Sequence, residues 1–249
     1  MAQKKSGYSQ AAQNRIKNYT AKQSLQSARA VRRRRDNIIA IIAGSIAVVF
    51  AIGSITVLGA FAPTASPSPT TTATAEVPDK SLAENRQWTG TISINGSPIE
   101  ISLDGEKAPQ AVANFITLAK KGFYNGVTCH RLTTAGIYVL QCGDPKGDGT
   151  GGPGYAWGPI ENAPPGNTYK FGTLAMARQG GNGDSMGSQF FIVYATSMIP
   201  ADNAGGYTVF GQITKGGESL NPIIQGGVVD NGTDGKPNVA TTINSIQVQ

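Results

Sequence analysis

The sequence predicts a mainly β domain, a barrel or sandwich with helical caps, over roughly the last 162 residues. A strong hairpin pattern opens this region, one clear helix follows, and several short apolar runs separated by glycine come after the helix. Glycine makes up 32 of the 249 residues, nearly twice the ordinary share of about 7%. This excess favours turns and tight loops and argues against a helical bundle.

The hairpin is predicted from two alternating segments on either side of a tight turn. Residues 88–94 and 99–103 each alternate polar and apolar side chains, which is the pattern of a half-buried strand. Asn95 and Gly96 stand between them, and this dipeptide favours the turn that joins two antiparallel strands. We therefore expect the domain to begin with an antiparallel pair.

The helix is predicted over residues 109–119. Pro109 suits a first turn, and Gly122, which follows two lysines, suits the end. The apolar positions of this segment recur with the spacing of one helical face: Val112, Phe115, Ile116 and Ala119. The glycine-separated apolar runs that follow are expected to be short strands, at residues 137–140, 171–175, 190–193, 207–210 and 243–248.

The positive charge of the chain is concentrated at its N-terminus. Lysine and arginine total 21 against 15 aspartate and glutamate residues, a formal charge of +6, but residues 1–36 alone carry +9 and the remainder −3. A basic tail on a mildly acidic body is not typical of a globular nucleic-acid-binding protein, and we expect no nucleic-acid partner. Two cysteines exclude a disulfide scaffold, and the single histidine excludes a metal site built from several histidines, so we expect no metal.

An uncharged apolar segment covers residues 38–61. As a helix its 24 residues would reach about 36 Å, enough to cross a hydrocarbon core of about 30 Å. A buried core helix would need polar residues on one side, and this segment is apolar all round. A cleavable signal peptide would have a shorter apolar region, and the nearest small-x-small site, at residues 60–62, is followed by Pro63. We therefore expect a permanent single-pass anchor that contacts the lipid bilayer.

The flanks of this segment predict its orientation. Four arginines at 32–35 directly precede it, and basic residues stay on the cytoplasmic side. We expect a basic cytoplasmic tail over 1–37, the transmembrane anchor over 38–61, a disordered and extended Pro/Thr/Ser-rich linker over 62–86 and an extracytoplasmic domain over 87–249. Binding of nucleic acid or anionic headgroups by the tail is the alternative to its role as an orientation signal.

Two motifs in the body match catalytic patterns without the context that those patterns need. Residues 183–187 match the nucleophile elbow G-x-S-x-G, but the only histidine, His130, comes before this serine instead of after it. Residues 147–152 match G-x-G-x-x-G, yet Pro153 and Gly154 follow where a helix would have to begin. We therefore reject a serine hydrolase and a dinucleotide site, and we expect residues 147–152 to be a loop.

Three further segments, in a fixed order, carry a resemblance to a known family. The first combines Cys129-His130-Arg131 with residues 138–144, the second combines residues 176–178 with the rarely seen run at 187–192, and the third is residues 206–211. Together they resemble the cyclophilins, a family of peptidyl-prolyl cis-trans isomerases. With the expected anchor ahead of it, the chain looks like the membrane-bound bacterial branch of that family. The resemblance implies an eight-stranded antiparallel barrel capped by two helices.

The reaction of this family turns an X–Pro peptide bond about its C–N axis. Amide resonance sets a barrier of about 18–20 kcal/mol, and in the twisted state the proline nitrogen has a lone pair that it lacks in the planar states. A donor aimed at that nitrogen stabilises the twisted state more than either planar one. The resemblance implies that Arg131 is this catalytic donor, and that Gln141 holds Arg131 and touches the substrate backbone. No cofactor is expected; an ordinary surface cation is the alternative interpretation of Arg131.

The resemblance also implies which residues bind the substrate. An apolar pocket for the proline ring would be formed by Tyr138, Val139, Phe191, Met198 and Ile199. The peptide backbone would run along a strand edge at Ala177 and Arg178, and Gln189 would line the adjoining groove. His130 matches the family histidine beside the arginine, and Tyr207 occupies the position usually held by a pocket histidine.

Several of these residues have plainer interpretations. Tyr138, Val139 and Ile199 are alternatively simple barrel packing. For His130 we favour a structural hydrogen bond over a catalytic role. Phe190 alternates with Phe191 along one strand, so we expect Phe190 to face the core.

The chain departs from the family pattern in the hairpin and in the pocket. Arg131 and Gln141 are ten residues apart, two more than usual, which lengthens the hairpin between them. Residues 198–200 replace a tryptophan-leucine pair, and Tyr207 replaces a histidine. Weaker activity is expected from the loss of an aromatic side chain.

Cys129 and Cys142 fall on the two arms of this hairpin. Outside the cell the two thiols are candidates for a disulfide, but cysteines on neighbouring strands meet strict geometric limits, and the pairing stays open. The function expected is a prolyl isomerase that acts on exported polypeptides and assists their folding outside the membrane. A weakly active or inactive proline-peptide-binding module of the same fold is the alternative.

Overall fold

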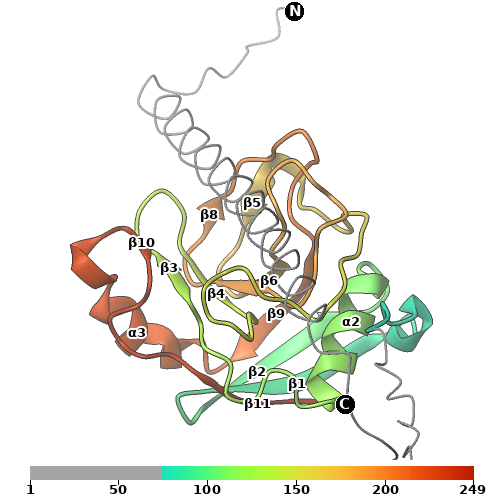
Figure 1. Ribbon diagram of the computed structural model, residues 1–249, viewed down its shortest axis with the longest axis horizontal. Coiled ribbons are helices and arrows are strands. Elements are labelled where there is room, and N and C mark those ends of the chain that lie inside the picture. Colours follow the sequence, from blue (N-terminus) through green and yellow to red (C-terminus); the bar gives the residue numbers. More distant parts are fainter. Residues whose placement is uncertain (1–74) are drawn as a thin grey trace, which may run out of the picture. The chain divides into compact units, whose positions relative to one another are not determined.

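A curled antiparallel sheet of nine strands forms the body of the fold in the computed structural model, which describes residues 75–249 (Figure 1). Its strands follow the order β10-β3-β4-β7-β6-β9-β2-β1-β11. Their bounds are β1 (Gln87–Ile94), β2 (Ser97–Asp104), β3 (Arg131–Thr133), β4 (Val139–Cys142), β6 (Thr173–Met176), β7 (Phe190–Val193), β9 (Val209–Lys215), β10 (Asp234–Gly235) and β11 (Ile243–Val248). A separate pair consists of β5 (Thr168–Tyr169) and β8 (Ser197–Met198).

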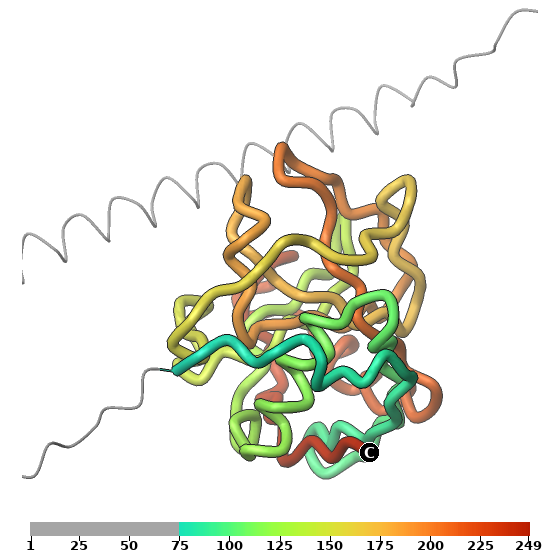
Figure 2. The backbone as a smooth tube through the Cα atoms, turned by 90° about the vertical axis from the view of Figure 1, so that its right-hand side faces the viewer, coloured from blue at the N-terminus to red at the C-terminus, as the bar shows by residue number. Residues whose placement is uncertain are grey.

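Two α-helices accompany the sheet in the described part of the chain. Helix α2 (Pro109–Lys120) contacts β11, β2 and β9, and α3 (Asn221–Gly226) lies toward the other side of the sheet (Figure 1). Short 3₁₀-helices lie at η1 (Lys80–Ala83), η2 (Pro165–Asn167), η3 (Gly217–Leu220) and η4 (Val229–Asn231). Strand β11 pairs with β1, so the red end of the tube in Figure 2 returns to the first strand of the domain.

The resemblance implies eight strands, and the sheet has nine. All five apolar runs predicted to be strands overlap one, respectively β4, β6, β7, β9 and β11. The strand β10 has two residues and pairs with β3 at one end of the sheet. A strand of two residues is too short to show an alternating pattern, so the sequence did not indicate it.

The predicted hairpin is confirmed. Ile94 pairs with Ser97 across the turn, and Asn95 and Gly96 between them have φ angles of 49° and 80°. Two positive φ angles in succession match the twist of the flanking strands, and asparagine and glycine adopt them at the least cost.

The predicted helix is confirmed, and its apolar face forms the centre of the core. Phe115 is fully buried, and its ring lies 5.3 Å from Tyr124, 5.4 Å from Phe190 and 5.0 Å from Phe210, measured between ring centroids. Phe190 therefore faces the core, as expected from its alternation with Phe191. This aromatic cluster joins α2 to the middle of the sheet and fixes the strands that carry the site.

The folded domain begins before the predicted boundary at residue 87. Residues 80–86 were predicted to belong to an extended linker, but Lys80–Ala83 form η1 and Ala83 is fully buried. The indole nitrogen of Trp88 donates a hydrogen bond to the carbonyl of Ala83 at 2.9 Å. A composition rich in small and polar residues does not prevent order here, because α2 and Trp88 supply the contacts.

The predicted tail, the predicted anchor at 38–61 and the first part of the predicted linker lie outside the described residues. Within residues 75–249, no helix is both long and apolar enough to cross a bilayer. The membrane anchor therefore stays a prediction from the sequence.

Candidate active site

The register of the sheet places three predicted site residues in one row. Arg131 on β3 lies opposite Gln141 on β4, and Gln141 lies opposite Phe191 on β7. Residues directly opposite on antiparallel strands project to the same face. The ten-residue spacing between Arg131 and Gln141 is thus accommodated by the connection between the strands, and the register of the two residues is kept.

A chain of hydrogen bonds runs along this face. The Nη1 atom of Arg131 donates to Oε1 of Gln141 at 3.1 Å, and Nε2 of Gln141 donates to Oε1 of Gln189 at 2.9 Å. Nε2 of Gln189 donates in turn to the carbonyls of Gly149 and Gly151, at 3.1 and 2.9 Å. Gln141 therefore holds Arg131, as the resemblance implies, and Gln189 holds Gln141.

The loop that ends this chain is built around Asp144, a residue of the motif at 138–144 to which the sequence assigned no role. Asp144 is fully buried, and its carboxylate accepts hydrogen bonds from the backbone N–H groups of Lys146 at 2.8 Å and Asp148 at 3.1 Å. The N–H of Gly149 donates to the same carboxylate. The glycine-rich run at 147–152 is thus a loop, as predicted, and its function here is to present carbonyls to Gln189.

The predicted pocket residues divide into a buried and an exposed group. Phe191 and Tyr207 are buried, with ring centroids 5.5 Å apart. The structure also buries Val139 and Ile199, whereas Tyr138 and Met198 are 36% and 46% exposed. The exposed pair presents apolar surface that a ligand could cover.

Tyr169 supports the aromatic pair of Phe191 and Tyr207, and the sequence did not indicate this role. Its ring centroid lies 6.4 Å from those of Phe191 and Tyr207, and its hydroxyl accepts a hydrogen bond from the N–H of Tyr207 at 2.7 Å. Burial raises the pKa of the Tyr169 hydroxyl, so that it stays protonated. Tyr207 is therefore held through its backbone as well as its ring.

The sequence and the fold of this domain match those of known proteins. A family model described as cyclophilin type peptidyl-prolyl cis-trans isomerase/CLD matches residues 89–248. The chain belongs to this family. A crystal structure of a cyclophilin-type isomerase from Cryptosporidium parvum superposes with a TM-score of 0.56 at 29% identity, over 66% of this chain and 98% of that one. Another crystal structure of that protein, obtained in the presence of the dipeptide Ala-Pro, gives a TM-score of 0.55 at 30% identity, over 65% and 98% of the two chains.

Bacterial members of the family are similar over the same domain. The probable peptidyl-prolyl cis-trans isomerase B of Mycobacterium tuberculosis is 46% identical over 164 residues, 61% of this chain and 51% of that protein. Its counterpart in Mycobacterium leprae is 42% identical over 170 residues, 64% and 56% of the two chains. Peptidyl-prolyl cis-trans isomerase B of Bacillus subtilis is 44% identical over 138 residues, 54% and 89% of the two chains. The chain therefore spans about half of the length of the mycobacterial relatives.

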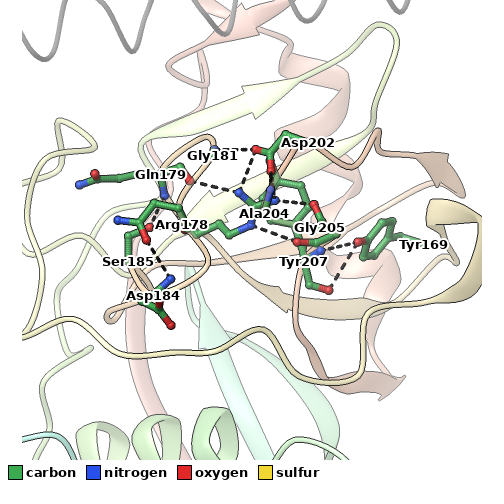
Figure 3. Close-up of polar contacts among 12 residues, drawn as sticks. Tyr169, Arg178, Gln179, Gly181, Asp184, Ser185, Asp202, Ala204, Gly205 and Tyr207 are labelled. Atoms are coloured by element: carbon green, nitrogen blue, oxygen red, sulfur yellow. Dashed lines mark hydrogen bonds and ion pairs between the residues drawn. The ribbon is translucent and has the colours of Figure 1, made fainter.

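The side chain of Arg178 has a structural role that the sequence did not predict. Its side chain is fully buried, and its guanidinium donates to both carboxylate oxygens of Asp202 at 2.9 Å (Figure 3). The remaining N–H groups donate to the carbonyls of Gln179 at 3.1 Å, Gly205 at 2.6 Å and Gly206 at 3.0 Å. All five donors are used inside the cyclophilin domain, so this side chain holds two loops together. The place of the Arg178 backbone along the peptide-binding edge stays a prediction.

The guanidinium of Arg178 also contacts a predicted pocket residue, Tyr207. The Cζ atom of Arg178 lies 4.7 Å from the ring centroid of Tyr207. Partial burial opposes ionisation of Asp202, but the hydrogen bonds from Arg178 and from the N–H groups of Gly181 and Ala204 outweigh it and hold the pKa of Asp202 below its usual value. Beside Arg178, the N–H of Ala177 donates to the carbonyl of Gln189 at 2.9 Å, so this part of the predicted edge is already paired.

His130 is not the structural hydrogen-bonder that the sequence predicted. Both of its ring nitrogens are buried, and neither finds a hydrogen-bond partner among residues 75–249. Burial lowers the pKa of His130, and the positive charge of Arg131 adds to this, against the attraction of Asp144. The imidazole is therefore mainly neutral at pH 7.

A disulfide joins Cys129 and Cys142, whose pairing the sequence left open. Both residues are buried, and they stand next to the catalytic candidates: Cys129 two residues before Arg131, and Cys142 directly after Gln141. The covalent link therefore ties together the two strands that carry Arg131 and Gln141.

Asp234 is a site residue that the sequence analysis missed. Its carboxylate accepts from Nε of Arg131 at 2.6 Å and from Nη2 at 2.9 Å. No motif pointed to Asp234, which lies 103 residues from Arg131 on the two-residue strand β10.

Proposed function

We propose that the cyclophilin domain catalyses the cis–trans isomerisation of X–Pro bonds in exported polypeptides. The observation that carries this proposal is the row of Arg131, Gln141 and Phe191 on adjacent strands. Neighbouring strands are about 4.8 Å apart, so Arg131 and Phe191 are separated by about 10 Å across the sheet. The Nη1 atom of Arg131 is directed along the row by its bond to Gln141, so a proline ring seated between Gln141 and Phe191 would have its imide nitrogen near the guanidinium.

The reaction requires little from the protein beyond this placement of the donor. The guanidinium is charged at every relevant pH and donates a hydrogen bond to the lone pair that appears on the proline nitrogen during the twist. Lowering the barrier by about 7 kcal/mol corresponds to a rate increase of roughly 10⁵-fold. Because no bond is made or broken, the residues of the site bind, orient and stabilise.

The substrate is a proline-containing peptide, and two observations support it. The pair of Phe191 and Tyr207 supplies apolar rings in contact with one another, and Tyr138 and Met198 add exposed apolar side chains. The related enzyme from Cryptosporidium parvum was crystallised in the presence of Ala-Pro, which contains the bond in question.

The site of action is outside the cytoplasmic membrane. The 24-residue uncharged segment and the arginines before it support a single-pass anchor with the cyclophilin domain on the far side. The disulfide between Cys129 and Cys142 supports an oxidising compartment, because reducing conditions keep cytosolic thiols free. Protease treatment of intact spheroplasts should remove the domain and leave residues 1–37 protected; protection of the whole chain would contradict this location.

A protease-coupled assay with a proline-containing peptide tests the activity. The full chain should accelerate the slow phase, and Arg131→Ala should reduce kcat/KM by about 100-fold or more, the loss typical of a main stabilising donor. Lys215→Ala is the matched control, because it removes an exposed cation whose contact is a surface pair with Glu100. Equal rates for the wild type, Arg131→Ala and the uncatalysed reaction would leave a peptide-binding module as the function.

A further inference from the structure

We propose that Asp234 is a positioning residue for Arg131: its carboxylate fixes the plane of the guanidinium that acts on the imide nitrogen. This inference rests on the proposed isomerase function and adds to it a residue that lies outside every motif of the sequence analysis. It also assigns a role to β10, a short strand that the sequence did not indicate.

The topology places the carboxylate beside the guanidinium. Asp234 on β10 lies opposite Thr133 on β3. Arg131 and Thr133 are two residues apart on one strand and project to the same face. Asp234 is therefore the diagonal neighbour of Arg131 across the pair of strands, within reach of a long side chain.

The contacts constrain orientation from two directions. Asp234 takes the Nε edge of the guanidinium through two parallel hydrogen bonds, at 2.6 and 2.9 Å, and Gln141 takes Nη1 at 3.1 Å. A bidentate contact between two planar groups fixes their common plane as well as their distance. With a third bond on the other side of Arg131, the guanidinium can neither rotate about its axis nor swing away from the row that ends at Phe191.

The exposure of the pair argues against a role in stability alone. The side chains of Arg131 and Asp234 are 28% and 40% exposed. An ion pair so open to water contributes little to the free energy of unfolding. Its benefit lies in preorganisation: an arginine already held in one orientation loses less conformational freedom when the substrate binds and when the bond twists.

Asp234→Asn and Asp234→Ala in the full chain test the proposal. Asp234→Ala should lower kcat about tenfold with KM changed less than twofold, and Asp234→Asn, which keeps one acceptor, should fall between this variant and the wild type. Asp230→Asn is the control, since it neutralises an exposed carboxylate four residues earlier and should leave both constants unchanged. In an Arg131→Lys background, Asp234→Ala should have no further effect. An unchanged or raised kcat in Asp234→Ala, or an equal loss in the Arg131→Lys background, would overturn the proposal.

A second measurement does not depend on activity. In the full chain labelled with ¹⁵N-arginine, the Nε–H signal of Arg131 is identified by its loss in Arg131→Lys. Because a carboxylate protects this N–H, the signal should be visible in the wild type and in Asp230→Asn and lost to solvent exchange in Asp234→Ala. A signal absent from the wild type, or unchanged in Asp234→Ala, refutes the positioning role. A wild type that shows the signal without isomerase activity refutes the proposed function and not the contact.

Discussion

Replacing Arg178 by methionine should destabilise the domain by about 3 kcal/mol. The guanidinium of Arg178 is fully buried and bonded to Asp202 and three backbone carbonyls, so a methionine leaves these acceptors without their donor. Removing one partner of a buried ion pair costs about 3–5 kcal/mol. Asp202 keeps 24% of its side chain exposed and retains the N–H groups of Gly181 and Ala204, which places the cost at the lower end.

The charge left on Asp202 is the larger part of this penalty. The double variant Arg178→Met/Asp202→Asn should therefore recover about 1–2 kcal/mol relative to Arg178→Met. The penalty also depends on pH with a definite sign. The folded-state pKa of Asp202 is depressed below its ordinary value of 3.8, so the contribution of the pair is complete above pH 3.8 and is lost as pH falls through the lower folded-state value. The difference between wild type and Arg178→Met should shrink in that range.

Urea unfolding followed by tryptophan fluorescence measures these differences. The two tryptophans of the chain, Trp88 and Trp157, are 2% and 4% exposed and report on the core. Lys215→Met removes an exposed cation and should change the free energy of unfolding by less than about 1 kcal/mol. A loss of less than 1 kcal/mol in Arg178→Met, or no recovery in the double variant, would refute the assignment of Arg178 as an internal clamp.

Two further predictions concern the hairpin that carries Arg131. Replacing both Cys129 and Cys142 by serine opens a covalent loop of sequence separation 13, which should cost about 3 kcal/mol; urea unfolding of the wild type with and without a reductant should show the same difference, and a stability independent of reductant would contradict it. Burial lowers the folded-state pKa of His130 below 6.5, so the unfolded state binds more protons as pH falls below that value, and the free energy of unfolding should decrease there. His130→Phe should remove this part of the pH dependence, and a profile unchanged by that substitution would show that other groups cause it.

Local patterns allowed the scaffold of the site to be predicted. The first hairpin, α2 and the inward direction of Phe190 each depend on residues that lie close together in the sequence. Alternation, helical spacing and the Asn-Gly turn act over the same short range. The position of Gln141 as the partner of Arg131 came from the resemblance, and the register confirms it.

Long-range contacts decided what the sequence could not predict. Asp234 meets Arg131 across 103 residues, through a strand too short to show a pattern. The motif that contains Arg178 gave no sign of where its side chain points, because that direction is set by Asp202, which lies 24 residues later. A side chain with five donors is oriented by the acceptors around it. Here most of these acceptors lie in the loop at residues 202–206, and no short sequence pattern predicts the path of that loop.

The chain of amides beside Arg131 explains why glutamine suits both intermediate positions. Arg131 has only donors to offer, and the loop at 147–152 offers carbonyls, so every group between them must accept on one side and donate on the other. A glutamate at position 141 would accept from Arg131 but would have no proton for Gln189, and a lysine would repel the guanidinium. The buried carboxylate of Asp144 fixes the loop at the far end, so the orientation of Arg131 also depends on Asp144, to which Arg131 is linked only through Gln141, Gln189 and the loop.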